Sequence, residues 1–214
     1  MFFSGRRVTK ASQTLNETGR IQYERAHPYV SRGALKLAGA INHFKLEPHG
    51  LVCLDIGAST GGFTELLILR GAVKIYAVDV GHGQMNPKLI KDPRVALLEG
   101  VNARDLTAKE IPQKPQAIVA DVSFISLKLA LPAALAMAEK GAWLVALVKP
   151  QFEAGRENVG KGGIVRDEAA QDAALAEISR WLSEDQAWSV LGTMQSPITG
   201  GDGNREFLIA ATKP

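Results

Sequence analysis

The stretch Leu51-Val-Cys-Leu-Asp-Ile-Gly-Ala-Ser-Thr-Gly-Gly-Phe63, followed by Ile75-Tyr-Ala-Val-Asp79, decides the fold of this chain. In each segment a short apolar run ends in an acid, and the first run continues into a glycine-rich turn that opens a helix. This order is typical of an open α/β sheet that binds a nucleoside at the carboxyl ends of its strands. Glycines let backbone N–H groups approach a ligand closely, and the start of the helix favours an anionic group. An acid on the second strand can accept hydrogen bonds from ribose hydroxyls.

The rest of the chain alternates strand-like and helix-like segments in the same way. We expect strands at 51–55, 74–79, 94–99, 117–121 and 142–149, and helices at 33–44, 61–70, 127–140 and 167–183. Ser31 is a candidate cap for the first of these helices. The last two apolar runs, 188–193 and 206–211, have no helix between them, so they are expected to pair antiparallel. The predicted fold class is α/β: a Rossmann-like, mostly parallel seven-stranded sheet with an antiparallel C-terminal edge hairpin.

Composition narrows the class of protein. The 214 residues include one cysteine, Cys53, which excludes an intramolecular disulfide and a cysteine-cluster metal site. His27, His43 and His49 lack ligand-like spacing, so no metal is expected. No apolar run reaches the roughly 18 residues that span a bilayer, and the first residues lack the apolar region of a signal peptide. We therefore expect a cytoplasmic protein with no membrane partner.

Positive charge is concentrated near the N-terminus. Residues 1–50 hold eight lysines and arginines against three glutamates, although the whole chain has a net charge of only +3. A basic leader on a near-neutral domain favours a polyanionic partner, with nucleic acid as the first candidate. A tail that serves only solubility is the alternative.

The glycine pattern discriminates between classes of cofactor. A nicotinamide site requires G-x-G-x-x-G, and a phosphate-binding loop requires Lys-Ser/Thr after its last glycine. Here the sequence reads Gly57-Ala-Ser-Thr-Gly61-Gly62 and continues with Phe63-Thr64. The pattern D-x-G-x-x-x-G-G instead resembles motif I of S-adenosylmethionine-dependent methyltransferases, and a glycine turn that serves only packing is the alternative.

That resemblance implies a set of cofactor contacts. The loop at 57–62 would hold the methionine end of S-adenosylmethionine, Asp79 would hold the ribose, and Asn102 would lie beside the adenine. The candidate cofactor-binding residues are Asp55, Gly57, Ala58, Ser59, Thr60, Gly61, Gly62, Phe63, Asp79, Asn102 and Asp121.

The methyl acceptor is indicated partly by motifs that are missing. Asp121-Val-Ser-Phe stands where Asn/Asp-Pro-Pro-Tyr/Phe would indicate an exocyclic amine, and the chain has no Pro-Cys nucleophile for carbon 5 of a pyrimidine. Four ionisable residues remain at suggestive places: Lys36 in the first helix, Asp121 and Lys149 at strand ends, and Glu206 at the start of the last strand. Strand ends are where such a sheet carries its chemistry. By position alone, each of the four can also be an ordinary surface charge.

Four further segments carry a more specific resemblance: Tyr29-Val-Ser-Arg-Gly-Ala-Leu-Lys-Leu-Ala-Gly-Ala40, Asp121-Val-Ser-Phe-Ile-Ser-Leu127, Val148-Lys-Pro-Gln-Phe-Glu153 and Gly160-Lys-Gly-Gly-Ile-Val-Arg166. Together they closely resemble the TlyA (hemolysin A) family. These proteins are ribosomal RNA 2′-O-methyltransferases with a catalytic domain like that of the FtsJ/RrmJ enzymes. The resemblance implies 2′-O-methylation of cytidine by a tetrad of Lys36, Asp121, Lys149 and Glu206. In this tetrad Lys149 would be the general base, Lys36 would position the hydroxyl, and the two carboxylates would orient the lysines.

The resemblance also implies a domain organisation and an RNA partner. Residues 29–214 correspond to the methyltransferase domain, and residues 1–28 to the tail of an S4-type RNA-binding domain or to a flexible basic arm. The partner is expected to be ribosomal RNA or ribosomal subunits, contacted by Arg6, Arg7, Arg32, Arg156, Lys161 and Arg166. Two other readings remain open: an RNA-binding protein without turnover, and the membrane activity that the name hemolysin implies.

Overall fold

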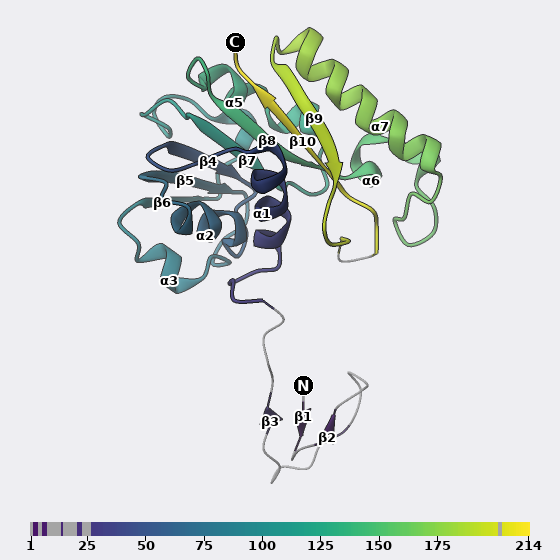
Figure 1. Cartoon of the computed structure of the whole chain (residues 1–214), viewed down its shortest axis with the longest axis horizontal. Helices are drawn as coiled ribbons and strands as arrows, with labels where there is room; N and C mark the ends of the chain where they lie inside the picture. The colour runs from purple at the N-terminus through teal and green to yellow at the C-terminus, as the bar shows by residue number, and fades with distance from the viewer. Residues whose placement is uncertain (1, 4–5, 8–13, 15–20, 23–26, 201–202) are drawn as a thin grey trace.

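The computed structural model describes residues 2–3, 6–7, 14, 21–22, 27–200 and 203–214, and a seven-stranded sheet organises most of them (Figure 1). The strand order is β6-β5-β4-β7-β8-β10-β9. The strands are β4 (Val52–Ile56), β5 (Lys74–Asp79), β6 (Val95–Glu99), β7 (Ala117–Ala120), β8 (Trp143–Val148), β9 (Ser189–Gln195) and β10 (Phe207–Thr212). The first five are parallel, and β10 runs antiparallel to both β8 and β9. The expected fold class is confirmed.

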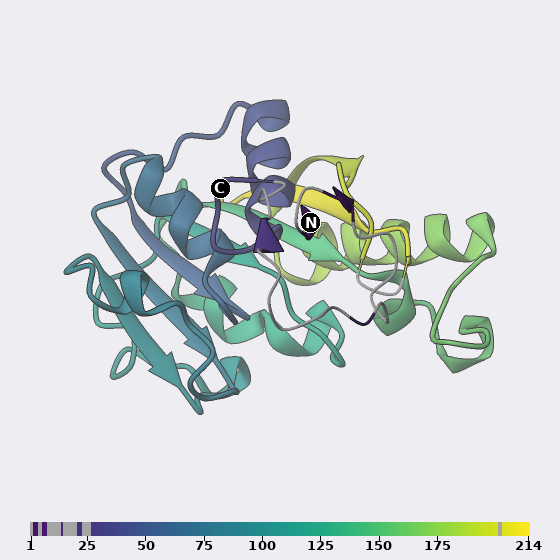
Figure 2. The same cartoon turned by 90° about the horizontal axis from the view of Figure 1, so that it is seen from below.

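Helices cover both faces of the sheet, with α1 on one side and the α4–α5 segment on the other (Figure 2). The helices are α1 (Gly33–Phe44), α2 (Gly62–Leu69), α3 (Pro87–Ile90), α4 (Leu127–Ala130), α5 (Pro132–Met137), α6 (Pro150–Glu153) and α7 (Glu168–Arg180). Short 3-10 turns lie at Ala103–Asp105 and Arg156–Asn158, and a π-helical turn at Trp181–Asp185 follows α7. One core packs α1 and α2 on the sheet, and the other packs α4, α5 and α7 on the opposite face.

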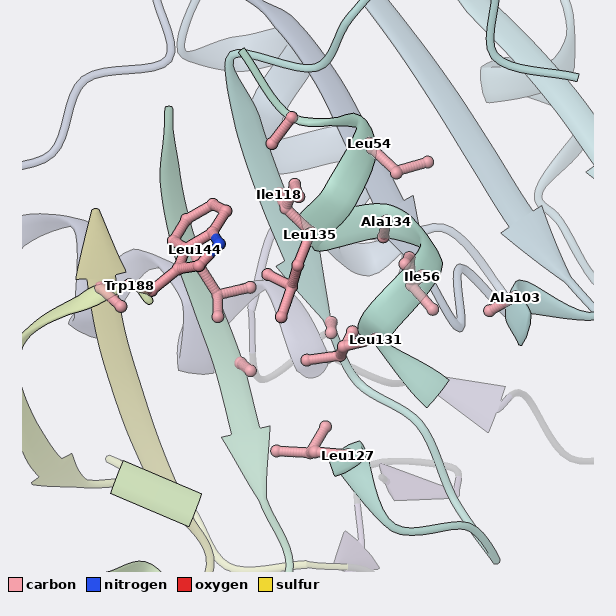
Figure 3. Close-up of a cluster of buried hydrophobic side chains, with 14 of the residues drawn as sticks. Leu54, Ile56, Ala103, Ile118, Leu127, Leu131, Ala134, Leu135, Leu144 and Trp188 are labelled. Carbon is pink, nitrogen blue, oxygen red and sulfur yellow. The ribbon is translucent and has the colours of Figure 1, made fainter. Parts of the chain in front are cut away.

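The second of these cores is drawn in Figure 3, where Leu131 and Leu135 of the α4–α5 segment lie over Ile118 and Leu144 of the sheet. All four side chains are at most 1% exposed. The core also includes Trp181 and Trp188, and Trp143 belongs to the core on the other face, so all three tryptophans pack in the interior. Fully buried leucine and isoleucine side chains contribute roughly 1.5–3 kcal/mol each, which makes these layers the rigid support for the strand ends.

Several element boundaries differ from those expected. The helix expected at 127–140 is two short helices, because Pro132 has no N–H with which to continue the hydrogen-bonding of α4, and the second helix ends at Met137. Ser31 is not the N-cap of α1: Arg32 holds that position without a side-chain cap, and the Ser31 hydroxyl accepts a hydrogen bond from the Gly33 N–H at 3.2 Å. The helix expected at 167–183 changes to a π-helical turn after Arg180.

Three short strands near the N-terminus form a separate antiparallel sheet in the order β2-β1-β3. They are β1 (Phe2–Phe3), β2 (Arg6–Arg7) and β3 (Ile21–Gln22). The side chains of Arg6 and Arg7 are outside the described residues. Within the part of the chain that the structure describes, no helix has the length and apolar character needed to cross a membrane. The same residues contain no group of three or more His, Cys, Asp or Glu side chains suited to a metal ion.

Candidate active site

The site forms where the strand order of the sheet reverses, between β4 and β7. The chain leaves β4 toward β5 on one side, whereas β7 lies on the other side, and open α/β sheets bind ligands in the crevice at such a point. Gly57 follows β4 and Asp121 follows β7, and the Asp121 N–H donates to the Ile56 carbonyl at 2.9 Å. Gly57 has a φ of 80°, and a Cβ there would lie 2.4 Å from the Asp121 carbonyl oxygen. Only glycine fits this contact, so the two strand-end loops are held against each other.

A cavity of about 470 Å³ opens beside this contact, outside the ends of β4, β5 and β7. This is within the size range of pockets that bind small organic ligands. Its polar lining includes five of the predicted cofactor-binding residues: Gly57, Ser59, Asp79, Asn102 and Asp121. Its other lining residues include Val122, Phe124 and Ile125 from the quoted segment at 121–127, and Val80, Gln84 and Val101, which the sequence did not single out. The apolar residues among them are suited to the faces of a purine ring.

Asp79 connects the glycine-rich loop to β5. One of its carboxylate oxygens accepts the Ser59 N–H at 2.7 Å, and the other accepts the Gly81 N–H at 2.7 Å. Ser59 has a φ of 45°, a left-handed conformation that this hydrogen bond helps to hold. Each carboxylate oxygen has a second lone pair, so Asp79 can still accept ribose hydroxyls at the cavity wall.

A second cavity of about 240 Å³ lies against the first and carries the ionisable residues. It is lined by Lys36, Asp121, Lys149 and Glu206, together with Ser31, Gly33, Gly57, Ala58, Ser59, Thr60, Gly62, Phe63 and Ser123. Four residues, Gly57, Ser59, Asp121 and Ser123, line both cavities. A group bound in one cavity is therefore adjacent to a group bound in the other. Of the remaining predicted cofactor residues, Ala58, Thr60, Gly62 and Phe63 face this second cavity, whereas Asp55 and Gly61 line neither.

The four candidate catalytic residues meet in a continuous chain of contacts. Lys36 Nζ lies 2.6 Å from Glu206 Oε2 and 3.8 Å from Asp121 Oδ2. Lys149 Nζ lies 2.6 Å from Asp121 Oδ1. Lys36, Lys149 and Glu206 are at most 8% exposed, so two lysines and two acids are paired in a largely buried site. Buried charges need such partners, because removing one member leaves its neighbour uncompensated at a cost of about 3–5 kcal/mol.

Sheet register explains how residues so distant in sequence come together. Asp121 and Lys149 follow the neighbouring parallel strands β7 and β8. Glu206 directly precedes β10, whose first residue pairs with the last residue of β8, so an antiparallel strand begins where its parallel neighbour ends. Lys36 comes from α1, on the helix face that packs on the sheet beside Leu37.

Asp55 lies beneath this site, fully buried within β4. Its Oδ2 accepts a hydrogen bond from the Thr64 hydroxyl at 2.6 Å, while its Oδ1 has no hydrogen-bond partner among the residues that the structure describes. Burial raises the pKa of Asp55 to about 7, with a smaller contribution in the same direction from the negative charge of Asp121. This hydrogen bond joins β4 to the start of α2 and so supports the glycine-rich loop between them.

Three polar residues to which the sequence assigns no role support the site. Lys149 Nζ donates to Ser123 Oγ at 2.8 Å. Glu153 accepts hydrogen bonds from the Ser126 hydroxyl at 2.6 Å and from the Leu127 N–H at 2.8 Å. Asn204 is 2% exposed, accepts the Val165 N–H at 3.2 Å and donates to the Gly163 carbonyl at 2.9 Å.

The candidate RNA-contacting residues are placed on the surface. The side chains of Arg32, Arg156, Lys161 and Arg166 are exposed. Arg32 directly precedes α1, four positions before Lys36. The other three lie on the segment between α6 and α7, and Asn204 anchors the end of that segment to the residues that precede β10.

Two adjacent cavities lie where the strand order of this sheet reverses. One is lined by Asp79, an acid suited to ribose hydroxyls, and the other by the buried cluster of lysines and acids. This arrangement and the fold are those of a methyltransferase. A structure with this fold, magnesium protoporphyrin IX methyltransferase from Synechocystis, contains bound S-adenosylhomocysteine. It is 14% identical, has a TM-score of 0.57, and the match covers 86% of this chain and 83% of that one. The chain belongs to the FtsJ-like methyltransferase family, whose model matches residues 29–213.

More similar proteins point to a narrower group. The 16S/23S rRNA (cytidine-2′-O)-methyltransferase TlyA of Mycobacterium tuberculosis is 45% identical over 202 residues, which cover 94% of this chain and 74% of that protein. A Lactococcus lactis protein described as a hemolysin has a solved structure with a TM-score of 0.84 and 44% identity. That match covers 87% of this chain and 89% of the other. The resemblance to the TlyA and hemolysin A proteins is therefore confirmed over most of the chain.

Proposed function

We propose that this protein transfers a methyl group from S-adenosylmethionine to the ribose 2′-hydroxyl of a cytidine in ribosomal RNA. The observation that carries the proposal is the contact chain from Glu206 through Lys36 and Asp121 to Lys149, which lines the smaller cavity and reaches the larger one at Asp121. TlyA of Mycobacterium tuberculosis, with the activity in its name, supports the acceptor. The protein would act in the cytoplasm, on ribosomal RNA or ribosomal subunits.

The residues of the larger cavity fit S-adenosylmethionine. The volume is adequate, Gly57 and Ser59 of the glycine-rich loop line the cavity, and Asp79 is available for ribose hydroxyls. Asn102 and the apolar wall would hold the adenine. When bound, the cofactor supplies an electrophilic methyl group on a positively charged sulfur.

The chain's own residues would prepare the acceptor hydroxyl in the smaller cavity. A 2′-hydroxyl is a weak nucleophile, so its proton has to leave as the new oxygen–carbon bond forms. Lys149 Nζ would accept that proton, which requires the neutral amine. Lys36 would hold the hydroxyl oxygen and stabilise the negative charge that develops there. Asp121 and Glu206 would fix the positions of the two lysines through the contacts described above.

RNA would reach this cavity over the basic surface. Arg32, Arg156, Lys161 and Arg166 are exposed and can contact phosphates, which position a nucleic acid without reading its sequence. Arg6 and Arg7 belong to residues 1–28, which we propose as an RNA-contacting segment outside the catalytic domain at 29–214.

The test is transfer of labelled methyl from S-adenosylmethionine to small- and large-subunit RNA and to assembled subunits. We expect label in RNA with the wild-type protein and a loss of about 10²–10⁴-fold in Lys149→Ala, the range that a general base contributes. Lys109→Ala changes an exposed lysine remote from the cavities and serves as the matched control. Retained S-adenosylmethionine binding by Lys149→Ala shows that the loss is in the transfer step. A Lys149→Ala variant as active as the control would contradict the proposed base.

A further inference from the structure

The loop between β7 and α4 places a hydroxyl against the proposed base. Lys149 Nζ donates to Ser123 Oγ at 2.8 Å, in addition to its 2.6 Å contact with Asp121 Oδ1. Ser123 is exposed and lines both cavities, so it lies at their junction. We infer that Ser123 is a positioning residue that aims the Lys149 amine at the acceptor hydroxyl. This inference rests on the proposed function.

The valence of the amine nitrogen supports this role. A neutral lysine amine has two N–H bonds and one lone pair. Asp121 and Ser123 can each accept one N–H, since both lie at hydrogen-bonding distance from Nζ. The remaining position on the nitrogen is then the lone pair, and Lys149 lines the smaller cavity that would hold the acceptor. With Asp121 alone as an acceptor, the amine can rotate about its Cε–Nζ bond and the lone pair loses its direction.

The Ser123 hydroxyl can hold the amine in this way because its loop is fixed at both ends. At the start, Asp121 is bonded to the end of β4 and packed against Gly57. At the far end, the Glu153 carboxylate of α6 accepts hydrogen bonds from Ser126 and Leu127. Catalytic groups gain from such support, because a loosely held side chain spends little time in the productive geometry.

An aromatic pair adds a further contact between the β7–α4 loop and α6. The rings of Phe124 and Phe152 lie 5.2 Å apart at an angle of 49°. Phe124 has a φ of 64°, a left-handed conformation rarely adopted by bulky residues, so the surrounding contacts hold the loop in one shape. Phe152 of α6 lies three positions after Lys149, and Ser123 and Phe124 are adjacent in the loop. The β7–α4 loop and the β8–α6 segment therefore keep the Ser123 hydroxyl next to the Lys149 amine.

The experiment measures kcat and both KM values for methyl transfer by the full chain and three variants. Ser123→Ala removes the acceptor, Ser123→Thr keeps a hydroxyl and adds a methyl group at an exposed position, and Ser189→Ala changes an exposed serine of β9 as the control. We expect Ser123→Ala to lower kcat by about tenfold, the effect of losing one hydrogen bond. Both KM values and the melting temperature should remain close to those of the wild type. Ser123→Thr should recover most of the lost kcat.

The outcomes separate this inference from the proposed function. If the wild-type protein transfers no methyl group to RNA, the proposed function fails and the inference fails with it. If the wild type is active and Ser123→Ala keeps the wild-type kcat, only the inference is overturned. The inference is also overturned if Ser123→Ala raises a KM while kcat stays unchanged, or if Ser123→Thr is as slow as Ser123→Ala.

Discussion

Replacing Gly57 by alanine should damage the point where the two strand-end loops meet. The residue has a φ of 80°, and a left-handed conformation costs a non-glycine residue about 1–2 kcal/mol. A Cβ would also lie 2.4 Å from the Asp121 carbonyl oxygen, so the backbone would have to shift. Forcing extra atoms into a packed region typically costs about 1–3 kcal/mol. The expected decrease in the free energy of unfolding is therefore about 2–5 kcal/mol.

Gly50→Ala provides a matched control for the contribution of backbone conformation. Gly50 has a φ of 75°, but a Cβ there would meet nothing within 4 Å. Only the conformational cost of about 1–2 kcal/mol should appear in this variant. Urea denaturation of both variants, followed by circular dichroism, isolates the steric part as the difference between them. Equal stability of the two variants would refute the account of how Gly57 and Asp121 hold the strand ends together.

Three other predictions concern single side chains elsewhere in the fold. The pKa of Asp55 is raised to about 7. Its contribution to stability is therefore complete below about pH 4 and is lost as the pH rises through 7. Over this range each pH unit changes the free energy of unfolding by up to about 1.4 kcal/mol. Asp55→Asn should therefore gain stability relative to the wild type between pH 4 and pH 8 in urea denaturation, and a pH-independent difference would contradict this. Lys213 Nζ donates to three carbonyls at the end of α5. Lys213→Met should therefore lower the free energy of unfolding by about 1–3 kcal/mol. The control Lys140→Met, at an exposed position, should have little effect. Asn204→Ala should speed amide hydrogen exchange at Val165, because it removes the buried acceptor of that N–H; unchanged exchange there would show that the segment is anchored elsewhere.

The sequence was most informative where local pattern and topology agree. Asp79, Asp121 and Lys149 each end an apolar run, and the strands of a parallel sheet bring such ends to one edge. Their clustering could therefore be predicted before the structure. Lys36 and Glu206 could not be assigned in this way, because a lysine on a helix and an acid before an edge strand are usually solvated. Their assignment came from the resemblance to a family, and the structure adds that both are buried and paired.

Residues that act through distant partners had no local signal. Ser123 and Glu153 lie in segments that carry the family resemblance, but no role could be assigned to them, because their partners lie 26 or 27 positions away in the sequence. Asn204 likewise has no local signal, because its partners lie about 40 positions earlier and depend on how the loop before α7 returns to the sheet. The break at Pro132 did have a local cause, since proline removes a helical donor, and the amphipathic pattern across it concealed that cause.

The most direct test of the proposed chemistry is the identity of the methylated nucleoside. Ribosomal RNA labelled by the wild-type protein would be digested to nucleosides and separated by chromatography with mass detection. The account predicts that the methyl group is on the ribose of cytidine, and that this product is lost with Lys149→Ala and kept with Lys109→Ala. A methyl group on a base would contradict the assignment of the smaller cavity to a 2′-hydroxyl and of Lys149 to its proton.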